Sequence, residues 1–228
     1  MLYIILIILL LGLLFGPQLW VRHVLRKYNA PQPHIPGSGG ELAQHLVERF
    51  QLDGVGVEPG DKDGDHYDPV NKKIRLSPEY FTTNSLTAVA IAAHEVGHAI
   101  QHQRNEPLLS LRTRLSYFAI TAQKLSGGLL LVIPFVMALT RAPSAGLVML
   151  VIGVASMLLG TLVQLVTLPV EIDASFNKAL PLLKQGNYIR AEDEKHVTKI
   201  LRAAAFTYLA GSLSSLLNLW RWLAILKK

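Results

Sequence analysis

The sequence predicts a mainly α-helical membrane protein with about four transmembrane helices and a small α+β cytoplasmic lobe. Two observations support the membrane class: 50% of the 228 residues are hydrophobic, and only 17% are charged. This composition is more apolar than that of a typical soluble domain. A third observation supports the lobe, because a long polar segment after the first apolar run contains both helix-like and strand-like patterns.

An N-terminal transmembrane anchor is expected at residues 1–22. Met1 to Val21 consists mainly of Leu and Ile and contains no charged residue. At about 1.5 Å per residue, a helix of this length would cross a hydrocarbon core about 30 Å thick. A cleaved signal peptide is the alternative, but the run lacks a preceding basic region and a small-x-small cleavage site. We therefore interpret it as an anchor.

Residues 23–112 are expected to form the soluble lobe. A Pro- and Gly-rich linker opens it, and Asn84 or Ser85 is the expected N-cap of its longest helix. The elements expected inside the lobe are an amphipathic helix at Gly40–Phe50, short strands at Val55–Val57 and Lys73–Leu76, an acidic loop at Asp61–Asp68 between them, and a helix from Ser85 through Ile100.

The rest of the chain alternates apolar and polar segments. A transmembrane hairpin is expected at 113–169, with apolar spans Leu115–Leu139 and Ala145–Leu168. A polar helical segment follows at 170–200. The final stretch, 201–228, is expected to be a transmembrane or membrane-associated helix, because Arg221 lies near the end of its apolar run.

The distribution of Lys and Arg predicts the orientation of the chain in the membrane. The polar segments carry most of these residues, whereas the opposite side has only Arg141, Lys227 and Lys228. The positive-inside rule therefore places both polar segments in the cytoplasm. The same basic flanks account for the net charge of +6 without a nucleic-acid partner.

One short motif carries the chemistry. His94-Glu95-Val96-Gly97-His98 matches H-E-x-x-H inside a segment already predicted to be helical. Residues four apart on a helix differ by only about 40° around its axis, so both imidazoles can bind one cation. Glu95 lies beside them, where it can act as general base. The alternative is a polar helix face that matches by chance, but ionisable groups within an apolar run are costly unless they are paired or bind a metal.

A catalytic zinc ion needs a third protein ligand. The chain has no cysteine, so this ligand must be His, Asp or Glu. His102 has turned about 80° away from His94 around the helix and converges poorly with it. Glu171, after Pro169 at the end of an apolar span, is the better candidate.

Several residues together resemble a known family. The stretch His94–Gln101, followed after a hairpin by Glu171-Ile172-Asp173-Ala174-Ser175, resembles the bacterial membrane neutral zinc metallopeptidases of the YugP type, distant relatives of the HtpX-like membrane proteases. The resemblance covers nearly the whole chain and implies a zincin-like lobe in a bacterial cytoplasmic membrane. It also implies that Glu171 is the third zinc ligand. In the relatives an Asp stands where this chain has Ser175, so Asp173 and Ser175 are both candidates to support a ligand histidine.

The function expected from these residues is zinc-dependent hydrolysis of peptide bonds, with Glu95 as the proton acceptor. Candidate donors to the developing oxyanion are His66, Tyr67, Tyr80, Asn177 and His196. The strand Lys73–Leu76 is a candidate open edge for pairing with substrate. The Asp-rich loop does not match a calcium site, because Lys72 occupies the position that needs a bidentate Glu.

Two alternatives remain at this point. One is an intramembrane-cleaving zinc protease, and the other is a non-catalytic zinc-binding membrane protein. The base Glu95 argues against the second, since a structural site needs none. The expected partners are a peptide or membrane-protein substrate and the lipid bilayer, with no oligomeric state indicated by the sequence.

Overall fold

The computed structural model describes residues 2–61, 64–140 and 166–207, together with isolated positions between 148 and 163 and residue 210. The chain divides into two compact units. We call residues 19–110 and 168–207 the lobe, and residues 1–18, 111–167 and 208–228 the long-helix unit. The lobe therefore combines two separate stretches of sequence.

Two long helices, α1 (Leu2–Lys27) and α5 (Pro107–Thr140), run through both units. Within the described part of the chain, no helix has both the length and the apolar composition needed to cross a membrane. The prediction of about four transmembrane helices is therefore wrong.

The physical reason is that the helices do not coincide with the apolar segments of the sequence. α1 contains Pro17 and continues to Arg26 and Lys27, and α5 carries Arg112 and Arg114 near its start. The other two predicted spans, Ala145–Leu168 and Leu201–Leu226, lie mostly outside the described residues.

A three-stranded sheet forms one side of the lobe. Its strands are β1 (Gly56–Pro59), β2 (His66–Asp68) and β3 (Lys73–Leu76), in the order β1-β3-β2. β3 pairs in parallel with β1 and antiparallel with β2, so the prediction that β3 offers an open edge is wrong. Part of the predicted acidic loop is strand β2. Three residues are too few to show the two-residue alternation by which a strand is recognised.

The two faces of the sheet differ in polarity. Ile74 and Leu76 of β3 are fully buried, whereas Arg75 between them pairs with Glu58 and Asp68 at 2.9 Å each. Hydrogen bonds from Asn71, followed by the Arg75 guanidinium, hold the pKa of Asp68 well below its usual range despite the opposing effect of burial. Charged cross-strand pairs on the exposed face leave the apolar face free to pack on helices.

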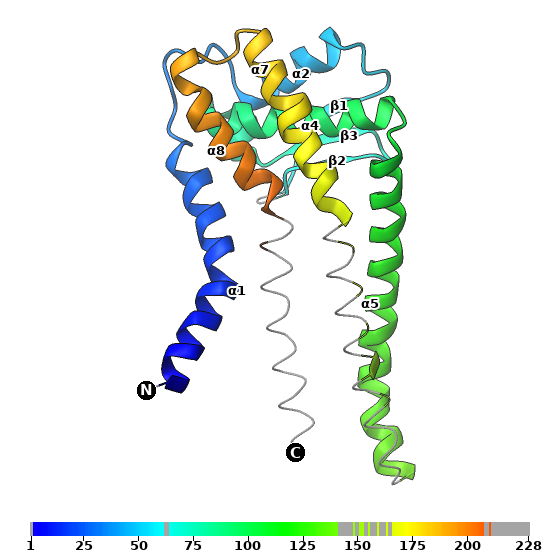
Figure 1. The fold of residues 1–228 in the computed structure, drawn as a ribbon. Coiled ribbons are helices and arrows are strands. Elements are labelled where there is room, and N and C mark those ends of the chain that lie inside the picture. Colours follow the sequence, from blue (N-terminus) through cyan, green and yellow to red (C-terminus); the bar gives the residue numbers. More distant parts are fainter. Residues whose placement is uncertain are drawn as a thin grey trace. The chain divides into compact units, whose positions relative to one another are not determined.

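Helix α4 (Leu86–Gln103) lies at the centre of the lobe. The Ser85 hydroxyl caps it by accepting a hydrogen bond from the Ala88 N–H, at 3.0 Å, which confirms Ser85 as N-cap. Every residue from Leu86 to Gln101 is buried. The helix packs against other protein elements on several sides, so protein contacts account for its apolar sequence (Figure 1).

The elements around α4 come from both stretches of the lobe. Helix α2 (Gly39–Arg49) begins with a capping box in which Ser38 and Glu41 bond each other's backbone N–H groups. The remaining elements are α3 (Pro78–Thr82), the π-helix η1 (Asp173–Ala179), α7 (Leu180–Gln185), the 3-10 helix η2 (Ala191–Asp193) and α8 (Glu194–Ala205).

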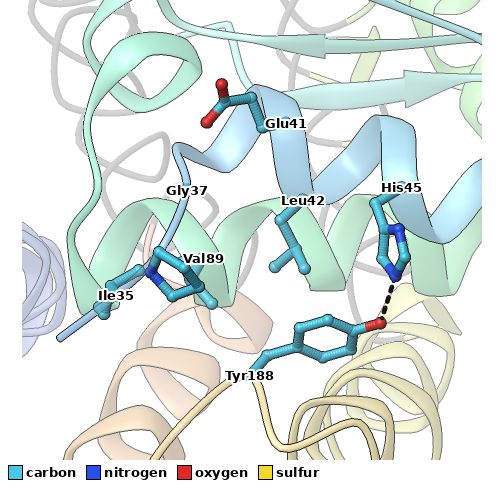
Figure 2. Close-up of a pocket in the computed structure, with 8 residues that line it drawn as sticks. Ile35, Gly37, Glu41, Leu42, His45, Val89 and Tyr188 are labelled. Carbon is cyan, nitrogen blue, oxygen red and sulfur yellow. Dashed lines mark hydrogen bonds between the residues drawn. The ribbon is translucent and has the colours of Figure 1, made fainter.

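A mainly apolar pocket of about 450 Å³ lies between α2, α4 and Tyr188. Figure 2 shows the Tyr188 ring beside Leu42, with its hydroxyl bonded to His45 at 2.8 Å. Val89 lines this pocket and precedes His94 by five residues, so the two lie about 140° apart around α4. The pocket is thus a feature distinct from the H-E-x-x-H residues.

Candidate metal centre

Three buried side chains converge in the lobe. The Nε2 atoms of His94 and His98 lie 3.1 Å and 3.2 Å from the same oxygen, Oε2 of Glu171. One ligand atom from each of the three residues lies within 4.8 Å of the others. All three are almost inaccessible to solvent, and Glu171 is 0% exposed. The structure therefore brings together the three residues that the sequence predicted as zinc ligands.

Helix geometry accounts for the two histidines. They are four residues apart on α4, and their rings meet edge to face with centroids 4.7 Å apart. This is the arrangement expected for i and i+4 side chains on one helix face.

A close approach between two segments brings Glu171 to the histidines. Residues 166–172 are helical and continue directly into the π-helix η1. At Gly97, between the two histidines, an added Cβ would lie only 2.8 Å from the Ala174 carbonyl oxygen. Only glycine therefore lets α4 and η1 approach this closely.

The outer nitrogen of each imidazole also has a hydrogen-bond partner. Nδ1 of His94 lies 3.0 Å from Oγ of Ser175, whose hydroxyl donates to the Leu201 carbonyl at 3.2 Å. Because that hydroxyl proton is already used, Ser175 accepts the bond from Nδ1–H of His94. Nδ1 of His98 lies 2.8 Å from the amide oxygen of Gln101, which can only accept. Both rings thus carry their proton on Nδ1 and direct an Nε2 lone pair toward Glu171.

This donor set fits a divalent cation. Two Nε2 lone pairs and a carboxylate oxygen are all acceptors, so a cation placed between them would satisfy all three. Two imidazoles and one carboxylate are a known ligand set of catalytic zinc sites. His94, His98 and Glu171 would hold the ion.

Comparisons with known proteins agree with this geometry. The family described as "Putative neutral zinc metallopeptidase" matches residues 3–227. The chain belongs to this family. It is also 34% identical over 231 residues to the "Putative membrane protease YugP" of Bacillus subtilis (strain 168), an alignment that covers 99% of this chain and 96% of that protein. No solved structure matches the chain. The family resemblance inferred from the sequence is confirmed.

The other predicted site residues have varied surroundings. Glu95 is buried on α4 beside His94. Asp173 accepts hydrogen bonds from Gln101 and Asn177 at 2.7 Å and 2.9 Å and also pairs with Lys178. Burial opposes ionisation of Asp173, but these bonds outweigh it and lower its pKa to about 2.

Tyr67, His66 and His196 contact residues other than the three metal-binding ones. The Tyr67 hydroxyl bonds Nδ1 of His102 at 2.7 Å, and burial, with a contribution from Asp68, raises the pKa of Tyr67 to about 12. His66 bonds the Gly64 carbonyl, and His196 stacks on Tyr28. Tyr80 lies in α3.

Sequence reasoning missed one residue with a direct contact to the site. In the sequence Gln101 is only the last residue of the stretch His94–Gln101 that carries the family resemblance, yet it bonds the ring of His98. The available signal was its spacing, because residues three apart on a helix are neighbours.

Proposed function

We propose that this protein is a zinc-dependent endopeptidase in which His94, His98 and Glu171 hold the metal and Glu95 is the general base. The convergence of two Nε2 atoms on one buried carboxylate oxygen carries this proposal. When bound, zinc supplies Lewis-acid activation of water and of the scissile carbonyl. Membership of the metallopeptidase family supports the same reaction class.

The role assigned to Glu95 follows from its position. It is adjacent to His94 in sequence and about 100° from it around α4, so it stands beside the metal ligands rather than among them. Its carboxylate would accept a proton from the attacking water and pass it to the leaving amine. Among the oxyanion candidates, Tyr67 keeps its hydroxyl proton at neutral pH because its pKa is about 12.

The substrates we propose are proteins or peptides close to a membrane, on its cytoplasmic side. The relative in Bacillus subtilis is named a membrane protease. Large apolar side chains of α1, among them Leu9, Leu13 and Leu19, are exposed, as expected of a surface that meets lipid. Basic residues end this helix, and anionic lipids of a cytoplasmic leaflet attract such residues.

The surroundings of α4 favour this function over an intramembrane protease. Its apolar residues are buried against protein elements of the lobe and do not require lipid contact. Cleavage beside the membrane is therefore the simpler proposal.

The Glu95→Gln variant tests the reaction. Glutamine keeps the shape of the side chain but cannot accept the proton, so peptidase activity should fall by at least about 10²-fold. Bound zinc, measured by metal analysis of the purified protein, should stay at the wild-type level. Retained turnover would eliminate the proposed role of Glu95. A wild-type protein that binds zinc but cleaves no membrane-protein substrate would instead favour a non-catalytic zinc site.

A further inference from the structure

Gln101 connects His98 to the opposite segment of the lobe. Its side-chain nitrogen donates to the Val170 carbonyl at 3.0 Å and to Oδ2 of Asp173 at 2.7 Å. Its side-chain oxygen lies 2.8 Å from Nδ1 of His98. The side chain is 1% exposed, so water does not compete for these bonds.

The direction of these bonds is set by the groups at the far end. The Val170 carbonyl and the Asp173 carboxylate can only accept, so the NH₂ of Gln101 must face them. The amide oxygen is then forced toward His98. A flipped amide would place its oxygen against two acceptors in a buried site, at a cost of several unmade hydrogen bonds.

The Asp173 carboxylate is itself held in place. It pairs with the buried amine of Lys178, five residues along the π-helix, and accepts a hydrogen bond from Asn177 at 2.9 Å. Lys178 also pairs at 3.0 Å with Glu106, the residue immediately before α5. This chain of contacts therefore extends from Glu106 through η1 to the ring of His98.

From these contacts we propose that Gln101 is a positioning residue that fixes His98 in the Nδ1–H tautomer, so that the Nε2 lone pair faces the metal position. The proposal rests on the proposed zinc site and adds the residue that orients the imidazole of His98 in it. Because an amide oxygen accepts but does not donate, it selects the tautomer as well as the orientation of the ring.

The test uses the purified full-length protein with ¹⁵N-labelled histidine. In the metal-free protein at about pH 8, above the usual imidazole pKa, NMR distinguishes the two neutral tautomers by their ring-nitrogen shifts. In the wild type, His94 and His98 should both be Nδ1–H. Gln101→Met should release His98 toward the Nε2–H form while His94, which is held by Ser175, stays unchanged. Zinc affinity, measured by competition with a chelator, should fall about 10- to 100-fold.

Two further variants separate this role from simple packing. Gln101→Glu keeps an oxygen acceptor beside His98, and its carboxylic acid form can still donate to Asp173, so the Nδ1–H tautomer should persist. Ser175→Ala is the reciprocal control, since it should release His94 and leave His98 unchanged. If Gln101→Met does not fold, the Gln101→Glu spectrum still tests the proposal, and an Nε2–H form of His98 there would overturn it.

The outcomes also distinguish this inference from the proposed function. An unchanged His98 tautomer in Gln101→Met overturns the positioning role, whatever the zinc affinity. The spectra are recorded without metal and without substrate, so they test the positioning role independently of catalysis. If the His98 tautomer changes in Gln101→Met but the wild type cleaves no peptide, the positioning role is supported and the peptidase assignment is not.

Discussion

Three histidines spaced four residues apart along α4 have different partners. His94 and His98 face Glu171, whereas Nδ1 of His102 bonds the Tyr67 hydroxyl. Each step of four residues turns the side chain by about 40° around the helix. By the third histidine, the ring therefore lies toward strand β2 instead of the metal position.

This difference predicts opposite effects of two alanine substitutions. Glu171→Ala removes a ligand oxygen and should greatly reduce the zinc bound by the purified protein. His102→Ala should leave bound zinc unchanged and should cost about 1 kcal/mol of stability through the lost bond to Tyr67. Zinc content and thermal unfolding of both variants measure these effects. Loss of zinc in His102→Ala with retention in Glu171→Ala would exchange the two roles.

The close contact between α4 and η1 at Gly97 determines how near Glu171 lies to His94 and His98. In Gly97→Ala, the new methyl group would lie 2.8 Å from the Ala174 carbonyl oxygen and 3.3 Å from its Cα. The two elements would have to separate, at a cost of about 1–3 kcal/mol. We expect zinc affinity to fall along with stability, because Glu171 and Ser175 both lie on the displaced segment. Chelator competition and denaturant unfolding would show both effects.

A matched substitution on α1 controls for the loss of a helical glycine. Gly12 has no atom within 4 Å of an added Cβ. Gly12→Ala should therefore leave zinc affinity unchanged and raise stability slightly, by about 0.5–1 kcal/mol. If Gly97→Ala behaved in the same way, the close approach of α4 and η1 would not be what positions Glu171.

The elements differ in how well the sequence predicts them. Helix α4 and the convergence of its two histidines followed from an N-cap, an apolar pattern and a four-residue spacing, which are all local signals. Glu171 followed from its place after an apolar span. Strand β2 was missed because it is only three residues long, and π-helix η1 has no pattern of its own. The contact between His98 and Gln101 needs a specific rotamer, which spacing alone does not fix.

The candidate metal centre joins two stretches of chain that are distant in sequence. His94 and His98 belong to the stretch 19–110, and Glu171 belongs to 168–207. The Ser175 and Gln101 contacts cross the same junction. A bound cation would therefore act as a cross-link between stretches that the long-helix unit separates in sequence.

Metal removal should consequently destabilise the lobe. A ligand that binds only the folded state adds about 2.7 kcal/mol when its free concentration is 100 times its Kd. For a chain of this length, that corresponds to a fall in Tm of roughly 5–10 °C when a chelator removes zinc. The shift should be reversible on adding zinc and absent in Glu171→Ala, because that variant has no cation to lose. An equal shift in both proteins would mean that the chelator acts elsewhere, and no shift in the wild type would mean that the three side chains hold no ion in the folded protein.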